Sequence, residues 1–337
     1  MVEFIHAVED WALMKDAWNG LLARSAADFP FLRWEYQRAW WRHAGGGELP
    51  SGELRIALWR VDGVLRGIAP LLRTTEAGAP ALRLIGSAEI SDYLDVIAAP
   101  EDLESFCVEL LDALAALPPA DWTTLDLHNL HPSSRTPSAI SAAADRNGWK
   151  WDTRSLEVCP VIRLPGSWEE YLGSLDKKQR HEIRRKLRRV EGGEEIVAMR
   201  KTVGPEWAAG MEDFLRLMAF DPRKAEFLTP VMREQFRALA EAAEEAGMLQ
   251  LAFLEVDGRK VAGFFNFDYR DRIWVYNSGM DPAFAALSPG WVLLAFLLRE
   301  AIELGRKDFD FLRGNEAYKF LWGGAGETIT RLTVHRK

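Results

Sequence analysis

The chain has 337 residues and a formal charge of −8 at neutral pH; 48% of its residues are hydrophobic and 27% are charged. These proportions are typical of globular domains and exclude a largely disordered chain, and the length is sufficient for two domains. The two cysteines have no CxxC spacing, which excludes a disulfide framework and a zinc–thiolate centre.

The N-terminal segment has charged side chains at Glu3, Glu9 and Asp10, so it lacks the uninterrupted apolar core of a signal peptide. The longest apolar run, WVLLAFLL at 291–298, is far shorter than the ~20 residues that span a bilayer. Together with the scarcity of cysteine, these features predict a soluble, cytoplasmic protein without a membrane span.

Two ten-residue stretches, LRIALWRVDG at 54–63 and LQLAFLEVDG at 249–258, align without a gap. Each alternates apolar and polar residues up to an Asp-Gly pair and then resumes with apolar residues, which predicts a β-hairpin. The patterns after the hairpins also correspond, and they read strand, helix, strand, helix. The expected elements lie at 92–100, 101–117, 122–130 and 137–147 in the first half, and at 272–282, 289–305, 307–314 and 315–324 in the second.

This repetition predicts two similar α/β domains in tandem, each with a mixed, mostly antiparallel sheet flanked by helices. The join is expected near 150–165, where Pro165 and Gly166 mark a turn before a new helix start. We therefore assign 1–160 to the first domain and 161–337 to the second.

The two halves differ at the start of the central helix. In the second half, Ser288 is suited to the N-cap, Pro289 to the first helical position, and Gly290 to close approach of a ligand to the backbone. The N–H groups and dipole at such an end attract anions. In the first half, Glu101 and Asp102 would repel a phosphate. A phosphorylated cofactor is therefore expected at the second half, although the same residues also suit a helix start that binds nothing.

A basic helix is expected at 176–190, because KKQRHEIRRKLRR at 177–189 contains eight Lys or Arg residues. At 100° per residue, Ile183, Leu187 and Val190 share one narrow inward face. The cations form two rows, Lys177, Arg180, Arg184 and Arg188 in one, and Lys178, Arg185 and Arg189 in the other.

Three interpretations of this helix remain open. The cations form a solvated face, they bind an anionic substrate or the phosphates of a cofactor, or they bind RNA such as tRNA. The net negative charge of the chain disfavours a broad nucleic-acid surface but permits a local patch.

The strand at 307–314 is expected to place Phe309 and Phe311 on one face, with Asp308 and Asp310 on the other. A buried Asp310 needs a partner, which Arg313 or another nearby base could supply. The alternative to a chemical role is that Asp310 is a structural anchor.

Other kinds of chemistry have no sequence signal. The two histidines of HNLH at 128–131 are three residues apart and would face opposite sides of a strand, so we assign no metal. The chain has no Gly-x-Ser-x-Gly elbow and no Cys/His pairing pattern, so covalent catalysis is not expected.

The layout of 249–337 resembles the GNAT acyltransferase fold. The tandem arrangement, with YLGSLDKKQRHEIRRKLRR, SDYLD and FDFLRGNEAYKFLWG, is similar to the CelD/BcsL-type acyltransferases, which are relatives of the FemAB aminoacyl-transferases. The resemblance covers about 30–330. It implies acyl-CoA, such as acetyl-CoA, as co-substrate. The family's pyrophosphate loop reads Gln/Arg-x-x-Gly-x-Gly/Ala, whereas ALSPGW here keeps only Gly290. Because the FemAB relatives use aminoacyl-tRNA, the donor stays open.

The resemblance also implies roles for individual residues. Tyr318 would protonate the departing CoA thiolate, and Lys319 would contact the acyl ester or a phosphate; the alternatives are a packed Tyr318 and a solvated Lys319. The candidate catalytic residues are Tyr318, Lys319, Asp310 and Tyr276; the candidate cofactor-binding residues are Ser288, Pro289, Gly290, Trp291 and Asn277; and the candidate substrate-binding residues are Asp95, Tyr93, Arg180, Arg184 and Arg313.

These expectations combine into an N-acyltransferase that moves an acyl group from acyl-CoA to an amine by direct attack. The acceptor would be a small amine or a sugar- or nucleotide-linked amine, bound by a degenerate first domain together with the basic helix. One alternative is a FemAB-like aminoacyl-tRNA-dependent transferase. Another is a non-catalytic binding module of a polysaccharide or cell-envelope pathway.

Overall fold

The computed structural model describes residues 1–49, 51–86, 88–202 and 204–336. The Cα positions divide the chain into two compact units. Unit 1 is Met1–Glu157 together with the segment from Thr328 on, and unit 2 is Val158–Glu327. The division lies three residues before the one expected from the sequence. The C-terminal segment belongs to unit 1 rather than to the second domain, because its strand pairs with a strand of unit 1.

Unit 1 contains two groups of strands. One group has the order β1-β3-β4-β7, and the other has the order β15-β8-β6-β5-β2. Strands β6 and β8 run parallel, whereas the hairpin strands pair antiparallel. The strands are β1 (Val2–Ile5), β2 (Glu53–Leu54), β3 (Ile56–Val61), β4 (Val64–Ala69), β5 (Leu71–Glu76), β6 (Ala79–Leu84), β7 (Ile97–Ala98), β8 (Thr124–Leu130) and β15 (Ala325–His335).

The helices of unit 1 flank these strands. They are α1 (Val8–Ala12), α2 (Lys15–Leu22), the 3₁₀ turn η1 (Pro30–Leu32), α3 (Trp34–Arg42), α4 (Leu103–Ala116) and α5 (Thr136–Arg146). Helix α4 packs on β3 and β4 and contacts α5. The strand expected at 92–100 is reduced to the two residues of β7.

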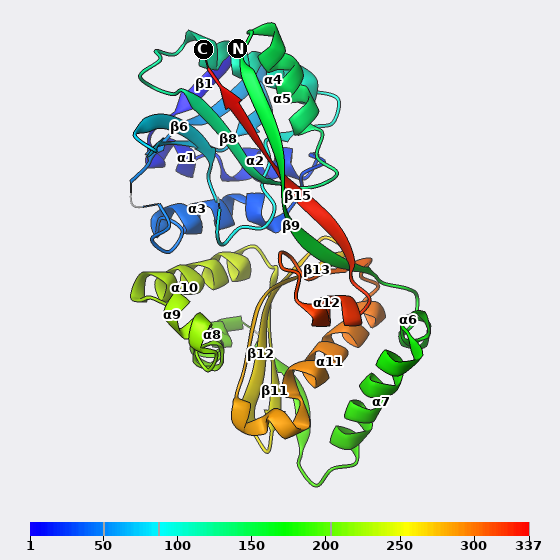
Figure 1. Cartoon of the computed structure of the whole chain (residues 1–337). Helices are drawn as coiled ribbons and strands as arrows, with labels where there is room; N and C mark the ends of the chain where they lie inside the picture. Colours follow the sequence, from blue (N-terminus) through cyan, green and yellow to red (C-terminus); the bar gives the residue numbers. More distant parts are fainter. Residues whose placement is uncertain (50, 87, 203, 337) are drawn as a thin grey trace. The chain divides into compact units, whose positions relative to one another are not determined.

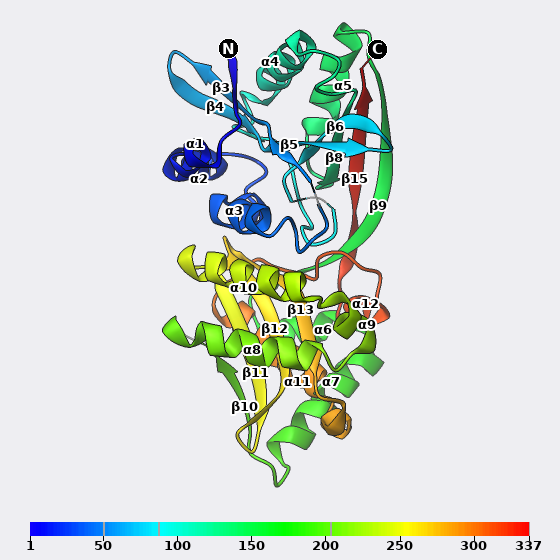
Figure 2. The same cartoon turned by 90° about the vertical axis from the view of Figure 1, so that its left-hand side faces the viewer.

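Unit 2 has one sheet between two helical layers (Figures 1 and 2). Its strand order is β10-β11-β12-β13-β14-β9, with β13 and β14 parallel. Helices α8 and α10 cover one face, whereas α11 covers the other and contacts α7. The elements are β9 (Lys150–Arg163), α6 (Trp168–Ser174), α7 (Lys177–Glu191), β10 (Val197–Lys201), η2 (Gly204–Glu206), α8 (Trp207–Met218), α9 (Pro222–Phe227), α10 (Pro230–Glu245), β11 (Leu249–Val256), β12 (Arg259–Tyr269), β13 (Arg272–Met280), η3 (Pro282–Leu287), α11 (Pro289–Glu303), β14 (Asp308–Asp310) and α12 (Ala317–Leu321).

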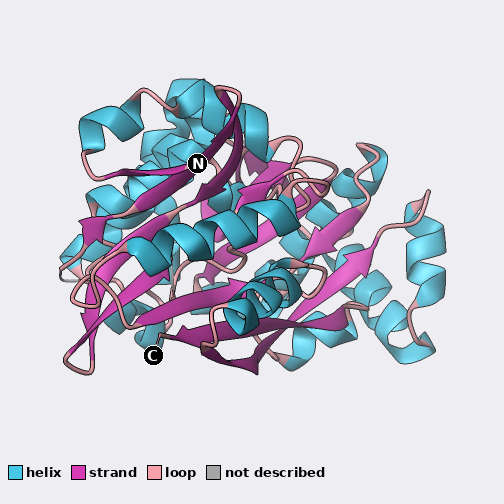
Figure 3. Ribbon diagram, turned by 90° about the horizontal axis from the view of Figure 1, so that it is seen from above, coloured by secondary structure: helices cyan, strands magenta, loops and turns pink. Residues whose placement is uncertain are grey.

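The expected fold class is confirmed, because helices and strands occur throughout both units and the sheets are mixed and mostly antiparallel (Figure 3). Both Asp-Gly hairpins form with the same turn. Asp62 and Gly63 have φ of 51° and 78°, and Asp257 and Gly258 have φ of 50° and 77°. Two successive positive φ angles define the type I′ turn, which matches the twist of the strands.

The basic helix forms as α7. The carboxylate of Asp176 caps its first turn by accepting a hydrogen bond from the Gln179 N–H at 2.9 Å. Ile183, Leu187 and Val190 are buried, as the helical period predicts, and they join the core shared with α11. The apolar face of α7 is thus used inside unit 2, and the two predicted rows of cations, which do not include Lys186, lie outside this face.

Strand β15 completes unit 1. It pairs antiparallel with β8, and its Ile329, Leu332 and Val334 are fully buried. Arg331 Nε and Nη2 donate to Oδ1 and Oδ2 of the buried Asp126 at 2.6 and 2.9 Å. This bidentate pair joins two strands that are 205 residues apart in the chain.

No helix in the described part of the chain is long and apolar enough to cross a bilayer.

Gly279 allows α8 to lie directly on β13. A Cβ built at Gly279 would be 2.6 Å from Met218 Cα, and a backbone cannot yield as a flexible side chain can. We expect Gly279→Ala to lower the free energy of unfolding by about 1–3 kcal/mol, the usual cost of overpacking. Gly290→Ala is the control, because its nearest neighbour, Met280 Sδ, would be 3.6 Å away. Urea unfolding checks this; equal stability of the two variants would contradict it.

Candidate active site

A cavity of about 520 Å³ lies where α11 begins, and we call it the α11 pocket. Most of its lining is apolar, and Phe220 and Met280 on its border are 41% and 46% exposed. The described lining residues are Leu217, Met218, Phe220, Asp221, Pro222, Lys224, Phe264, Ser278, Gly279, Met280, Pro282, Gly290, Trp291, Leu294, Tyr318 and Trp322. Residues from both helical layers and from the end of β13 therefore meet around one cavity.

The start of α11 differs in one detail from the expectation. Ser288 precedes Pro289 as expected, but Ser288 has the left-handed φ of 54° and its side chain does not cap the helix. Its hydroxyl oxygen instead accepts a hydrogen bond from Lys186 Nζ at 3.1 Å. Lys186 Nζ also lies 4.3 Å from the centre of a ring of Trp291. Helix α7 therefore places a cation, which also forms an ion pair with Glu182 at 3.6 Å, beside the positive end of the α11 dipole.

Gly290 leaves space at the pocket wall. The nearest atom to a Cβ at this position would be Met280 Sδ, at ordinary contact distance. Packing within unit 2 therefore does not require glycine at this position. Close approach of a ligand to the backbone does require it, because a side chain would stand in the way. Trp291 also borders the pocket and lies 5.1 Å from Trp322, between ring centres.

Tyr318 and Lys319 separate at the start of α12. Tyr318 borders the pocket and stacks edge-on against Phe311, and burial raises the pKa of its phenol, so it stays protonated at neutral pH. Lys319 does not border the pocket and is not solvated. It is buried, donates to the carbonyl oxygen of Arg313 at 2.5 Å, and forms an ion pair with Glu316 at 3.0 Å.

The two catalytic candidates on the strands are engaged elsewhere. Asp310 is fully buried and has a basic partner, as expected; Arg272 Nη1 on the neighbouring strand donates to its carboxylate at 3.1 Å. Phe309 and Phe311 lie in the core on the α11 side, so the expected alternation of β14 is confirmed. Tyr276 contacts the rings of Phe236, Phe265 and Phe267, and neither Tyr276 nor Asp310 is among the described residues that border the pocket.

Asn277 orients a residue that the sequence did not single out. Its Oδ1 accepts hydrogen bonds from the Ser278 N–H and from Lys224 Nζ, each at 2.9 Å. Lys224 belongs to α9, whose sequence DPRKAEF is typical of an exposed polar helix. No pattern in the sequence marks its side chain as one that reaches the end of β13. Asn277 itself contacts the pocket through these partners rather than by bordering it.

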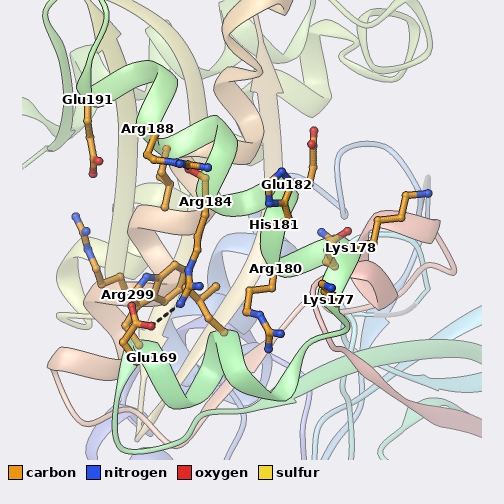
Figure 4. A pocket seen from close by; sticks show the side chains of 14 residues that line it. Glu169, Lys177, Lys178, Arg180, His181, Glu182, Arg184, Arg188, Glu191 and Arg299 are labelled. Carbon is orange, nitrogen blue, oxygen red and sulfur yellow. Dashed lines mark hydrogen bonds and ion pairs between the residues drawn. The ribbon is translucent and has the colours of Figure 1, made fainter.

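A second cavity, which we call the α7 groove, lies between α6 and α7 (Figure 4) and has a volume of about 1230 Å³. Arg184 is paired with Glu169 at 2.6 Å, and Arg180 Nη1 donates to the carbonyl oxygen of Gly173 at 3.3 Å. The described lining residues are Trp168, Glu169, Leu172, Lys177, Lys178, Gln179, Arg180, His181, Glu182, Arg184, Leu187, Arg188, Glu191 and Arg299. Basic side chains outnumber acidic ones in this lining, so the groove is electropositive.

The structure does not bring the groove and the pocket together. Their described linings share no residue. Between them, Ile183 and Leu187 of α7 lie against Trp291 and Trp322. Arg180 and Arg184 therefore lie apart from Tyr318. Arg313 borders neither cavity among the residues described.

Among the described residues of unit 1, the cavity at the start of the corresponding helix is much smaller. The cavity at the start of α4 has a volume of about 30 Å³, and Asp102 before α4 is paired with Arg66 at 3.1 Å. Tyr93 is fully buried and lies 4.9 Å from His131, between ring centres, so a substrate cannot reach it without rearrangement. Asp95 borders this small cavity and is 3% exposed.

In the described part of the chain, no three His, Cys, Asp or Glu side chains lie together so that they could hold a metal ion.

Comparison with known proteins identifies the class of the second unit. Residues 177–320 match the family model described as Acetyltransferase (GNAT) domain, and this segment contains Lys186, Lys224, Gly290 and Tyr318. The chain therefore contains a GNAT-type acetyltransferase domain. No curated protein sequence matches the chain.

Solved structures show how far the fold extends. The crystal structure of FemX has a TM-score of 0.68 at 11% identity, covering 98% of this chain and 96% of that one. A conserved protein of unknown function from Bacteroides thetaiotaomicron has a TM-score of 0.64 at 12% identity, and the match covers 100% of both chains. The C-terminal domain of a putative lysylphosphatidylglycerol synthetase from Agrobacterium fabrum has a TM-score of 0.58 at 10% identity. The match covers 97% of this chain and 92% of that one. Both units thus share the fold of these proteins.

Asp95 makes the stability of unit 1 depend on pH. Burial raises the pKa of its carboxyl to about 6 from 3.8, against the hydrogen bonds of Ser134, Thr136 and the Val96 N–H. The folded state therefore binds more protons than the unfolded state between pH ~4 and ~6, and stability falls as pH rises through this window.

We therefore expect Asp95→Asn to be more stable than the wild type at pH 7.5 by up to about 3 kcal/mol, and the difference to disappear near pH 4. Chemical unfolding of the full chain at several pH values checks this. Asp112→Asn, which changes an exposed carboxylate of α4, is the control. A difference that does not vary with pH would contradict the assignment.

Proposed function

We propose that the chain is an N-acyltransferase that moves an acyl group from acyl-CoA to the amine of a small or sugar-linked acceptor. The observation that carries this proposal is the α11 pocket, in which the start of α11, the end of β13 and Tyr318 surround one cavity. The segment that matches the acetyltransferase model contains all three. Within this class, we further propose kinship with the CelD/BcsL-type enzymes and a cytoplasmic location.

The lining of the pocket suits each part of acyl-CoA. The apolar walls match the pantetheine arm and the acyl chain, and the start of α11 with Lys186 matches the diphosphate. The space at Gly290 permits close approach of the ligand. The indole N–H of Trp322 is buried without a hydrogen-bond partner among the described residues, and a bound ligand could accept from it.

The proposed reaction is direct attack. The amine nitrogen bonds to the thioester carbonyl carbon, the C–S bond breaks, and the thiolate takes a proton from the Tyr318 hydroxyl. The surplus proton of the amine leaves through water and restores Tyr318. We assign no step to Asp310, whose carboxylate is held by Arg272, or to Tyr276.

The acceptor is expected to be anionic if the α7 groove contributes to its binding. Lys177 and Lys178 have no ion-pair partner among the described residues, and Arg180 donates only to a backbone carbonyl. Arginine and lysine in a groove are suited to phosphate and carboxylate groups. We keep Arg180 and Arg184 as proposed substrate-binding residues on this ground, at a distance from the reacting atoms.

Calorimetric titration with CoA, acetyl-CoA and longer acyl-CoAs tests the proposal. We expect micromolar binding to the wild type and a loss of at least tenfold in Gly290→Leu, because the new side chain would fill the pocket. Gly173→Leu on α6 is the matched control, since nothing lies within 4 Å of a Cβ there. Millimolar or weaker binding of every CoA compound to the wild type would contradict the proposal.

A second candidate function is transfer from an aminoacyl-tRNA, and the cations of the α7 groove favour it. Tyr318→Phe and Lys319→Met distinguish the donors. With acyl-CoA, Tyr318→Phe should lower kcat by about 10²–10⁴-fold. With aminoacyl-tRNA, Lys319→Met should have the larger effect. Thermal unfolding of both variants is the control, because Lys319 holds the carbonyl oxygens of Leu312 and Arg313.

Titration with tRNA over a series of salt concentrations completes the comparison. Binding that weakens steeply with salt would favour the second candidate. No binding at low salt would exclude it. A non-catalytic binding module predicts no turnover with any donor.

A further inference from the structure

Lys224 places an ammonium group at the wall of the α11 pocket. Its Nζ donates to Asn277 Oδ1 at 2.9 Å and to the Ser278 carbonyl oxygen at 2.6 Å. Among the described residues that line the pocket, it is the single cation. An ammonium group has three N–H bonds, and the two oxygens use two of them. One N–H is left for a ligand.

Burying the Lys224 ammonium costs desolvation free energy, which a hydrogen bond to a ligand would offset. Burial lowers the pKa of its amine; the carboxylates of Asp221 and Glu316 act in the opposite direction, and the cations of Lys319 and Arg223 add to the decrease. A methionine would fill the same apolar space without a desolvation penalty. Two oxygen acceptors at short distance nevertheless favour the protonated form, which can donate but cannot act as a base.

One backbone donor next to Lys224 is already used. The N–H of Ser278, which borders the pocket, is already bonded to Asn277 Oδ1. Asn277 Oδ1 therefore occupies the Ser278 N–H at the end of β13, and it also holds the Lys224 ammonium beside that residue. The arrangement replaces a neutral donor with a charged one, and charged donors form the stronger hydrogen bonds.

We propose that Lys224 is a catalytic residue of the acyl-transfer site and that its third N–H binds the carbonyl oxygen of the thioester. This inference rests on the proposed function. When the amine nitrogen bonds to the carbonyl carbon, the π electron pair of the carbonyl moves to that oxygen, and the ammonium stabilises the negative charge. When the C–S bond breaks, the pair returns to the carbonyl and the sulfur leaves with its own pair.

The first test compares acetyl-CoA with free CoA, because only acetyl-CoA has the carbonyl. We expect the wild type to bind acetyl-CoA about three- to tenfold more tightly than CoA, the range of one hydrogen bond. In Lys224→Met this preference should vanish while CoA binding is retained. Arg223→Met is the control, since the Arg223 side chain on the same helix is 93% exposed. It should keep the preference.

The outcomes separate the two hypotheses. If neither compound binds the wild type, the proposed function fails, and this inference fails with it. If both compounds bind but the preference for acetyl-CoA is absent, or persists in Lys224→Met, the role of Lys224 is wrong and the proposed function stands.

Turnover provides the second test, measured as release of the CoA thiol with a panel of amines. Loss of one oxyanion donor lowers kcat by about 10²–10³-fold, and we expect this in Lys224→Met, with a rise in KM for acetyl-CoA of no more than about three- to tenfold. In the wild type, kcat/KM should fall as rising pH removes the proton of Lys224, and this fall should be missing in Lys224→Met. A purely structural lysine would lower thermal stability and leave both the preference and the pH profile unchanged, which would overturn the inference.

Discussion

The parallel pairing of β13 with β14 fixes where unit 2 can bind a ligand. Parallel neighbours require a crossover, and α11 supplies it on one face of the sheet. Helix α11 must therefore begin beside the end of β13, after the short turn of η3. The positive end of its dipole, the last residues of β13 and helix α12 with Trp322 at its end meet there for topological reasons. Gly279 lets α8 lie close against β13 at this point, and Gly290 leaves the pocket wall without a side chain.

The two units share an order of elements but differ in the cavity at the start of the central helix. Both have an Asp-Gly hairpin, a central helix and a following strand, yet the cavity at the helix start is about 520 Å³ in unit 2 and about 30 Å³ in unit 1. In unit 1 the ring of Phe106 lies where any side chain at Gly67 would need to be, and Arg66 neutralises Asp102. Aromatic packing fills the region beside α4 in unit 1, whereas the matching region of unit 2 contains the α11 pocket.

Much of the architecture could be predicted from local patterns, because each depends on residues close in sequence. The hairpins follow from Asp-Gly turns, α7 from its capping Asp176 and its helical period, and the alternation of β14 from strand geometry. The open helix start at Gly290 and the position of Tyr318 were also predictable.

The parts that could not be predicted depend on long-range geometry. Lys224 reaches Asn277 across 53 residues of chain, and Lys319 turns inward to the loop before its own helix. Asp310 pairs with Arg272 on the neighbouring strand, a base that lies 38 residues away in the chain, and cations of α7 face a groove separate from the pocket. In each case the sequence shows the charge, but the direction of a long, flexible side chain depends on which strand or helix lies beside it.

The position of β15 has a consequence for the order in which unit 1 is completed. Asp126 on β8 pairs with Arg83 inside unit 1, but its bidentate partner, Arg331, follows the whole of unit 2 in the chain. On the ribosome, the edge of β8 that β15 covers therefore stays unpaired until unit 2 has been synthesised. Unit 1 begins first but is completed after unit 2, which differs from the usual N-terminal-first order of domain folding.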